Sequence, residues 1–352
     1  MKLDSKKVFR TLNPNKVWIP VALGVVIVGY LFYSDPDMTP DKLKLIFEAN
    51  VGAIVLAILV LVARDAGYVY RIRTLTDKNL SWTSSIYVII LWEFASAVTP
   101  SVVGGTAVAI FILHKEGINL GKALAYVMLT AILDNLFFVV ASPIVLAFAP
   151  DLFPAGSRMG YFFFTSYGLI ATYTFIMCYA LFIRPRAFKW FLLKVTSLRL
   201  LRRWRYAAYE RGNEIIWASS QLRGKAIDYW FKIIAATIFI WTSRYLMLNV
   251  LISGYRDLDL TEHLVTFSQQ IILWVVMLVA PTPGSSGMAE YAFREFFTPM
   301  LGGYVLVVMV PWRLLAFYFY LLLGVIFLPR WVRRVFGKKS TPNLDEETSS
   351  IN

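Results

Sequence analysis

The chain has 352 residues, of which 58% are hydrophobic and only 16% charged. A soluble domain carries more charge, and several apolar runs are long enough to cross a hydrocarbon core of roughly 30 Å. The formal net charge of +13 is better explained by membrane topology than by nucleic acid, so no nucleic-acid partner is expected. One cysteine and two histidines argue against a metal site, and the sequence predicts no cofactor.

The first half of the chain predicts four spans and one interrupted hairpin. Trp82–Val98 runs toward the outside, breaks at Thr99–Gly105, and returns as Thr106–His114, which is too short to finish a crossing. We therefore expect a re-entrant hairpin on the cytoplasmic side. The predicted spans are Val17–Ser34, Leu45–Tyr70, Leu120–Phe148 and Tyr161–Ile183.

The stretch 184–228 mixes Lys and Arg with Trp, Phe and Leu. This composition predicts a basic amphipathic segment that lies on the inner leaflet and contacts anionic lipids. A solvated loop whose charge is set by topology alone is the other interpretation. Arg64 and Asp65, near the inner end of the second span, are predicted to be interfacial.

The second half predicts another interrupted hairpin between two spans. Tyr229–Ile252 crosses outward, His263–Val279 enters from outside, Met288–Phe297 returns, and Tyr304–Leu328 crosses inward. Most of the 35 Lys and Arg residues then lie inside, as the positive-inside rule requires, and both termini are cytoplasmic. Residues 341–352 are predicted to be a disordered tail.

The two interruptions share the frame T-P-x-x-x-G, at Thr99–Gly104 and at Thr282–Gly287. Matching breaks in two halves of a membrane protein indicate an inverted-topology repeat with its site near the midplane. The predicted fold is an all-α polytopic membrane protein with six full transmembrane helices and two re-entrant hairpins. We expect one integral membrane domain, 1–340, with repeats at 45–148 and 229–328.

Each returning half-helix is expected to present unpaired N–H groups and the positive end of its dipole deep in the membrane. Two such ends that converge would form an anion site, although each hydroxyl there could instead only satisfy broken backbone. The candidate binding residues at the interruptions are Thr99, Pro100, Ser101, Gly104, Gly105, Thr282, Pro283, Gly284, Ser285, Ser286 and Gly287.

Charged residues inside the predicted spans are few, and intramembrane charge is a functional-site hypothesis by default. Arg313 and Arg244 are the candidates for an anionic group, because guanidinium matches phosphate with two hydrogen bonds. Glu93 and Asp134 could carry protons or hold those arginines in place. Glu290 is a further binding candidate, with an ion pair to Arg294 four residues later as the alternative.

The stretch P-T-P-G-S-S-G-M-A-E (Pro281–Glu290) resembles the P-x-P-G-G-x-G-x-x-E signature of the lysylphosphatidylglycerol synthase transmembrane family. V-T-P-S-V-V-G-G (Val98–Gly105) resembles that family's earlier break, and Asp134 and Arg313 look like its acid and its arginine. Ser285 replaces the second glycine, and Ser101 with Val102 stands where the family often has Gly-Arg. The resemblance implies a protein of the bacterial cytoplasmic membrane that moves, or helps move, a polar lipid between leaflets.

The family's bifunctional members carry a soluble aminoacyl-transferase domain, whereas this chain stops after its last predicted span, so we expect no enzyme activity and no catalytic residue. The predicted function is flippase-like transport of an anionic or phosphate-bearing lipid. The alternatives are an ion- or proton-coupled transporter of a small anion, a membrane transferase, and a non-catalytic partner of a lipid-synthesis complex. Whether the chain forms a homo-oligomer stays open.

Overall fold

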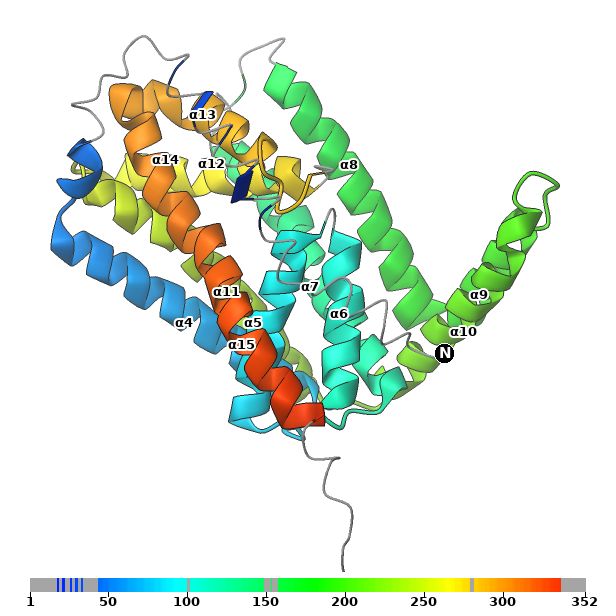
Figure 1. Cartoon of the computed structure of the whole chain (residues 1–352). Helices are drawn as coiled ribbons and strands as arrows, with labels where there is room; N and C mark the ends of the chain where they lie inside the picture. Colours follow the sequence, from blue (N-terminus) through cyan, green and yellow to red (C-terminus); the bar gives the residue numbers. More distant parts are fainter. Residues whose placement is uncertain are drawn as a thin grey trace, which may run out of the picture.

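The computed structural model describes residues 44–99, 102–148, 153, 158–278 and 282–336, with scattered positions between 18 and 33. The elements of this part of the chain are helical (Figure 1). Its long members are α4 (Val51–Leu75), α7 (Leu120–Phe148), α8 (Arg158–Cys178) and α11 (Ile227–Ser253). A last helical run comprises α14 (Val305–Arg313), the π turn η7 (Leu314–Tyr318) and α15 (Phe319–Phe336).

Five helical runs of the described residues are long and apolar enough to cross a membrane by length and composition. They lie at five of the six predicted spans, and the sixth, Val17–Ser34, falls in its greater part outside the described residues. The bounds differ from the prediction at both ends of the chain. The second span is helical over Val51–Leu75, after a short 3-10 turn at Leu45–Phe47. The final run continues past Leu328 to Phe336.

Short polar side chains fix where the helices begin. Asn50 Oδ1 accepts a hydrogen bond from Gly52 N–H at 2.8 Å, and Ser81 Oγ accepts one from Ser84 N–H at 3.0 Å. These side chains satisfy backbone donors that a first helical turn leaves without partners. Asp77 and Lys78, in the turn before α5, adopt positive φ of 51° and 61°. This turn reverses the chain between α4 and α5 (Trp82–Val98).

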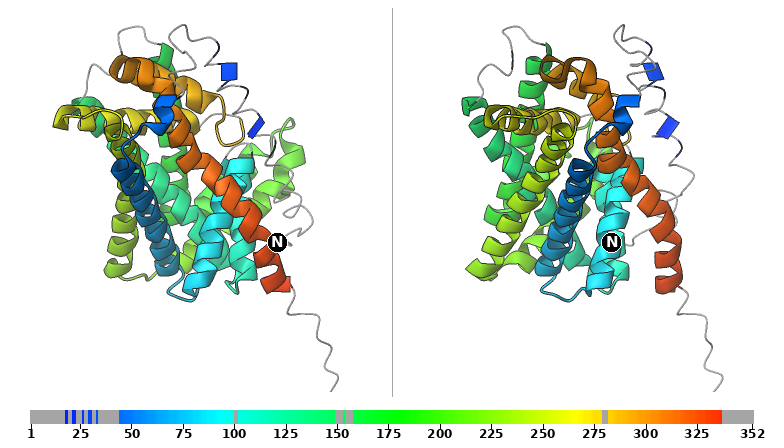
Figure 2. Two further views of the ribbon diagram at one scale, coloured as in Figure 1. Left: turned by 60° about the vertical axis from the view of Figure 1, so that its left-hand side comes forward. Right: turned by 90° about the vertical axis from the view of Figure 1, so that its left-hand side faces the viewer.

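Helices α4 and α11 pack against each other along their length in antiparallel directions (Figure 2). Asn50 N–H donates to Gly254 O at 2.8 Å at one end, and Arg71 donates to Thr237 Oγ1 at 3.0 Å further along. Between them, a Cβ on Gly67 would lie 2.9 Å from Ile240 Cγ1. The missing side chain therefore lets the two backbones approach closely, which brings the polar residues of both helices to one level.

Two helix pairs contain the predicted interruptions. The first pair is α5 with α6 (Val102–Lys115), and the second is α12 (Leu260–Leu278) with α13 (Met288–Leu301). In Figure 1 the α12–α13 pair lies at the upper end of the bundle, and α6 extends from mid-height toward its lower end. The predicted return segment Met288–Phe297 is longer than expected, since α13 continues to Leu301 and ends where Gly302 adopts a φ of +52°.

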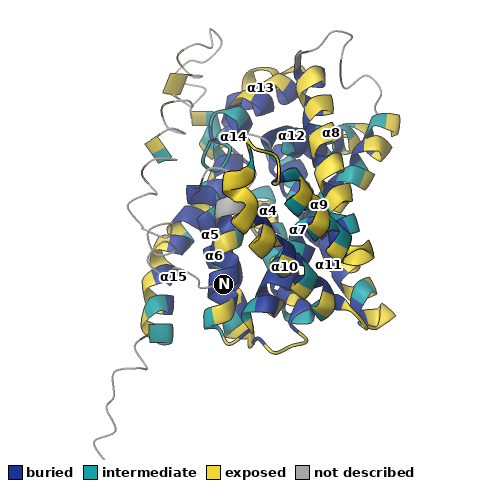
Figure 3. Ribbon diagram, turned by 90° about the vertical axis from the view of Figure 1, so that its right-hand side faces the viewer, coloured by how far each residue is buried: buried dark blue, intermediate teal, exposed yellow. Residues whose placement is uncertain are grey.

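The predicted surface segment 184–228 is a pair of helices, α9 (Pro185–Val195) and α10 (Arg205–Leu222), which extends away from the bundle (Figure 1). Lys189 on α9 joins them through a 2.7 Å hydrogen bond to Asn213 and through the face of Tyr209. Trp217 of α10 rests on Gly121 of α7, where a Cβ would lie 2.5 Å from the indole. Much of the outer surface of this pair is exposed (Figure 3).

Candidate functional site

A cavity of about 270 Å³ lies where the two interruptions meet the α4–α11 pair. Its walls come from α4, α5, α6, α7, α11, α12, the second interruption, α14, η7 and α15. The polar and aromatic residues that line it are Tyr68, Arg71, Trp92, Glu93, Ser96, Thr99, Thr106, Thr130, Asp134, Asn135, Trp241, Arg244, Trp274, Thr282, Ser285, Trp312, Arg313 and Tyr320. Residues of both interruptions therefore border the same space, as the sequence predicts.

Arg71 and Asp134 form the most fully bonded ion pair in this cavity wall. Arg71 Nη1 lies 2.5 Å from Asp134 Oδ1, and Nη2 lies 3.1 Å from Oδ2. Thr237 accepts a further hydrogen bond from Nη1, and Trp241 donates its indole N–H to Asp134 at 3.0 Å. A two-point pair with added donors and acceptors is the geometry that offsets the cost of burying both charges.

Arg244 and Glu93 form a much looser pair across the same cavity. A single contact of 3.2 Å joins Arg244 Nη2 to Glu93 Oε1, and the same nitrogen lies 3.5 Å from the hydroxyl of Tyr68. The guanidinium faces two indoles that pack edge to face on each other, with its carbon 5.1 Å from the ring centre of Trp241 and 4.7 Å from that of Trp274. The aromatic faces position the cation without using its N–H groups.

Three buried hydrogen-bond donors on residues that line the cavity have no acceptor among the described residues. They are Arg244 Nε, Trp274 Nε1 and Thr282 Oγ1, and all three residues line the cavity. Leaving a buried donor unpaired costs about 1–3 kcal/mol for each group. A ligand with several acceptor oxygens would satisfy donors of this kind.

Arg71 and Arg244 occupy corresponding places in α4 and α11. Each stacks on an aromatic ring three residues earlier in its own helix, at 5.2 Å for Tyr68 and 5.1 Å for Trp241. Each of those aromatic residues also reaches the ion pair of the opposite helix, through the Tyr68 hydroxyl or the Trp241 indole N–H. The two halves of the site are thus built on the same aromatic-x-x-Arg pattern.

Arg313 is paired with Glu290 beside the second interruption. Arg313 Nε lies 2.7 Å from Glu290 Oε1, and Nη2 donates to Ser286 Oγ at 3.3 Å. Glu290 Oε2 accepts the N–H of Gly287 at 2.6 Å, in the first turn of α13. The prediction of a free anion site at this helix N-terminus is wrong in this respect, because the carboxylate of Glu290 already occupies the position.

The geometry of the second interruption depends on glycine. Gly284 has a φ of +56°, and a Cβ there would lie 2.0 Å from the ring of Phe317. Ser285 follows with a φ of +55°, and its hydroxyl donates to Met277 O at 2.9 Å. This hydroxyl therefore satisfies a carbonyl at the end of α12, as the alternative interpretation of the hydroxyls expects.

The structure gives partners to the other charged residues singled out in the sequence. Arg64 is buried, bonds to Asp65 at 2.7 Å, and donates to the hydroxyl of Tyr320, which itself donates to Asp65 at 2.7 Å. That this pair lies at the membrane interface stays a prediction. Of the two roles considered for Glu93 and Asp134, Glu93 holds Arg244, whereas Asp134 is paired with Arg71.

The remaining predicted residues lie at or near the two interruptions. Thr99, Thr282, Gly284 and Ser285 line the cavity, and Gly105 packs directly on Ser96 of α5, where a Cβ would lie 2.2 Å from Oγ. Pro100 and Ser101 lie outside the described residues, as does the side-chain environment of Gly104. Pro283 is half-buried at the second interruption.

Sequence reasoning missed Arg71, Arg64, Tyr68, Trp241 and Trp274. A signal was available for three of them, because Arg64, Tyr68 and Arg71 have the i, i+4, i+7 spacing that places residues on one helix face. Within the described ranges, no three His, Cys, Asp or Glu side chains are grouped so that they could hold a metal ion.

Long apolar helices around a cavity lined with arginine–carboxylate pairs define a multi-pass membrane protein with a polar internal site. The sequence matches the lysylphosphatidylglycerol synthase TM region over residues 17–324. The chain belongs to this family, which confirms the resemblance found in its motifs. It is also similar to a UPF0104 membrane protein of Archaeoglobus fulgidus, with 24% identity over 332 residues that cover 88% of this chain and 94% of that protein.

Proposed function

We propose that the protein moves an anionic or phosphate-bearing lipid between the leaflets of the cytoplasmic membrane. The observation that carries the proposal is Arg244, an arginine in the cavity wall whose buried Nε lacks an acceptor among the described residues. Trp274, whose ring faces Arg244, and Thr282, which lines the same cavity, add two more unused donors. Phosphate oxygens accept several such hydrogen bonds at once, and guanidinium binds them in a planar fork.

The arrangement of the two helix pairs supports transport rather than simple binding. We propose that α5–α6 enters from the cytoplasmic side and α12–α13 from the outside, as parts of an inverted repeat at 45–148 and 229–328. The shared aromatic-x-x-Arg pattern of α4 and α11 supports that symmetry. In such repeats, a rocking motion around a fixed central site exposes it to each side in turn.

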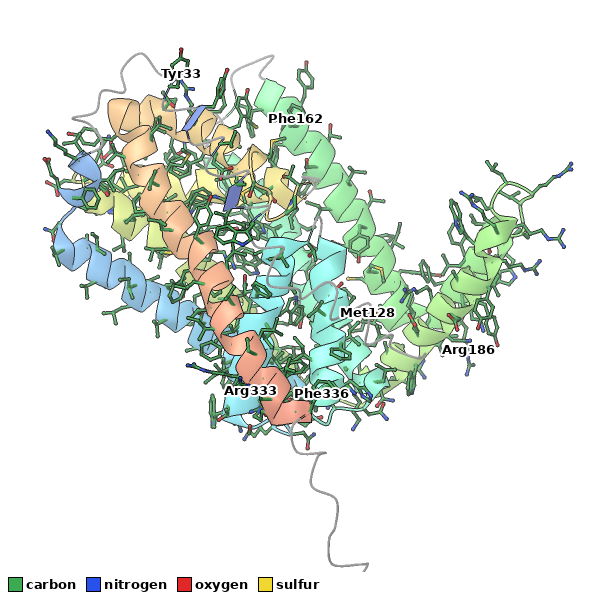
Figure 4. The ribbon with its side chains drawn as sticks, in the orientation of Figure 1. Tyr33, Met128, Phe162, Arg186, Arg333 and Phe336 are labelled. Carbon is green, nitrogen blue, oxygen red and sulfur yellow. The ribbon has the colours of Figure 1, made fainter. Side chains whose placement is uncertain are left out.

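The α9–α10 pair is proposed to lie against anionic lipids of the inner leaflet. Arg184, Arg186 and Arg223 surround a hollow between the start of α9 and the end of α10. Trp190 and Phe191 on α9, and Trp204 just before α10, are exposed. Arg333, near the end of α15, lies toward the lower end of the bundle in Figure 4, while Phe162 lies at the upper end. A lower cytoplasmic face would follow the positive-inside rule, with both termini on that side.

The test is translocation of fluorescent phosphatidylglycerol in proteoliposomes, compared between the wild type and Arg244→Ala. We expect the variant to lose roughly tenfold to hundredfold in apparent affinity, the value of charge-assisted hydrogen bonds to a guanidinium. Lys232→Ala removes a cation from an exposed ion pair with Asp228 on the same helix and serves as the matched control. Equal apparent affinity in Arg244→Ala and Lys232→Ala would mean that the headgroup does not bind to Arg244.

Two other functions can be distinguished from lipid translocation with the same proteoliposomes. Uptake of free phosphate without movement of the labelled lipid would favour a small-anion transporter. Absence of both activities, with retained lipid binding, would favour a non-catalytic partner of a lipid-synthesis complex. We propose that the chain is not itself an enzyme, and the arginine-lined cavity supports binding and release of a headgroup.

A further inference from the structure

The charges around the cavity are matched one to one. Arg71 is paired with Asp134, Arg244 with Glu93, Arg313 with Glu290, and Arg64 with Asp65. A headgroup that carries a negative charge therefore enters a site without surplus positive charge. It can accept a hydrogen bond from the unused Nε–H of Arg244, but it then faces the carboxylate of Glu93 on the same guanidinium. Repulsion between the two anions favours displacement of the carboxylate, which then needs a new partner.

The pair that opens most readily is Arg244 with Glu93. It has one contact of 3.2 Å, whereas Arg71 and Asp134 share two, with additional bonds from Thr237 and Trp241. The two carboxylates are about equally exposed, at 24% for Glu93 and 21% for Asp134, so the difference lies in their hydrogen bonds. Arg244 therefore has the free donor and the weaker internal bond, and it is where a ligand would exchange with a carboxylate.

The charged and titratable groups that face Glu93 come from five elements. They are Tyr68, Arg64 and Arg71 on α4, Asp134 on α7, Arg244 on α11, Arg313 on α14 and Tyr320 on α15. Each arginine other than Arg244 already has its own carboxylate, and Tyr320 is bonded to Asp65 and Arg64. Among the described residues that line the cavity, a displaced Glu93 therefore finds no other arginine without a carboxylate partner.

We propose that binding of an anionic headgroup to Arg244 and protonation of Glu93 occur together. This inference rests on the proposed function and deepens it. The ligand oxygen takes the place of Glu93 Oε1 on Arg244, and the carboxylate takes up a proton from the bulk solution on the side from which the headgroup enters, so the site keeps its net charge. One proton then crosses the membrane with each singly charged headgroup, so that transport is driven by a pH gradient and is electrically neutral.

The test uses the full-length protein in proteoliposomes containing fluorescent phosphatidylglycerol, with an imposed pH gradient or potassium-diffusion potential. For wild type, a gradient of one pH unit should shift the ratio of label between leaflets about tenfold, while the potential has no effect. In Glu93→Gln the proton is no longer carried, so the pH response disappears. The ratio instead follows the potential, about tenfold for 59 mV.

Matched variants show whether the effect belongs to Glu93. Glu93→Asp should keep part of the pH response, because the carboxylate is retained on a shorter side chain. Asp77→Asn removes a carboxylate that pairs with Lys225 in an exposed turn and should respond to the gradient as wild type does. If translocation in the wild type is indifferent to the pH gradient, or if Glu93→Gln still follows it, the coupling is refuted while the transport function stands.

A binding measurement separates this inference from the transport proposal. Short-chain phosphatidylglycerol is added to purified protein in weakly buffered detergent with a pH-indicating dye. We expect about one proton to be taken up for each lipid bound by the wild type, and none by Glu93→Gln. Proton uptake without translocation would support the exchange and contradict the transport function, whereas binding without uptake would overturn the exchange.

Discussion

Arg71 and Arg244 show how the same local pattern serves two different purposes in one cavity. Both follow an aromatic residue by three positions and stack on it at nearly equal distance, 5.2 Å and 5.1 Å. Arg71 is joined to its carboxylate at two points, but Arg244 is joined at one and keeps a buried N–H without an acceptor in the described structure. The comparison indicates that the first pair holds α4, α7 and α11 together, and that the second is left open for a ligand.

The strongest test of this contrast removes the carboxylate from each pair. Asp134→Ala leaves Arg71 buried, with the Thr237 hydroxyl as its one remaining hydrogen-bond acceptor among the described residues, and breaking a buried pair in this way costs about 3–5 kcal/mol. Glu93→Ala should cost less, because Arg244 keeps its contacts with the rings of Trp241 and Trp274 and has one weak contact to lose. Thermal unfolding of the two purified variants, followed by tryptophan fluorescence in the same detergent, measures the difference. Equal loss of stability would show that the pairs are not specialised.

The helix interruptions could be predicted from the sequence, but the ion pairs around the cavity could not. Pro and Gly at Thr99–Gly105 and at Thr282–Gly287 interrupt helices for local reasons, so both breaks could be predicted. Arg244, Glu93 and Arg313 stand out because charge is rare within apolar runs. Their partners could not be predicted, since Arg244 and Glu93 are brought together only by the packing of distant helices.

Arg71 illustrates the other source of error. It lies close to Arg73 and Lys78 at the end of an apolar run, where basic residues usually mark the cytoplasmic boundary. The helix continues to Leu75, however, and the register of α4 turns Arg71 toward Asp134 while Arg73 faces the ring of Trp82. Helix register distinguishes these two arginines, and charge counting treats them alike.

A smaller effect on stability is expected from Trp241, whose indole donates to Asp134 of the Arg71–Asp134 pair. Trp241→Phe keeps a ring beneath Arg244 and removes the N–H that donates to Asp134 at 3.0 Å, which should cost about 2 kcal/mol for a hydrogen bond to a charged group. Trp274→Phe is the matched control, because its indole N–H has no acceptor among the described residues. We expect Trp274→Phe to be the more stable variant and Trp241→Phe to retain stronger binding of phosphatidylglycerol. The reverse ranking in either measurement would contradict the assignment of these indoles.

The smallest effect on stability is expected from the hydroxyl of Tyr68, which lies beside the Arg244–Glu93 pair. Tyr68 lies 3.5 Å from Arg244 Nη2, a distance at which a hydrogen bond contributes little, so Tyr68→Phe should change the free energy of unfolding by no more than a few tenths of a kcal/mol. Tyr320→Phe removes a hydroxyl that bonds both Arg64 and Asp65 and should be clearly less stable in the same thermal assay. Because Tyr68 holds Arg244 so weakly, lipid affinity should also stay within about twofold of wild type. A large loss of lipid affinity in Tyr68→Phe would mean that the hydroxyl contacts the headgroup, so that α4 as well as α11 would contribute to headgroup binding.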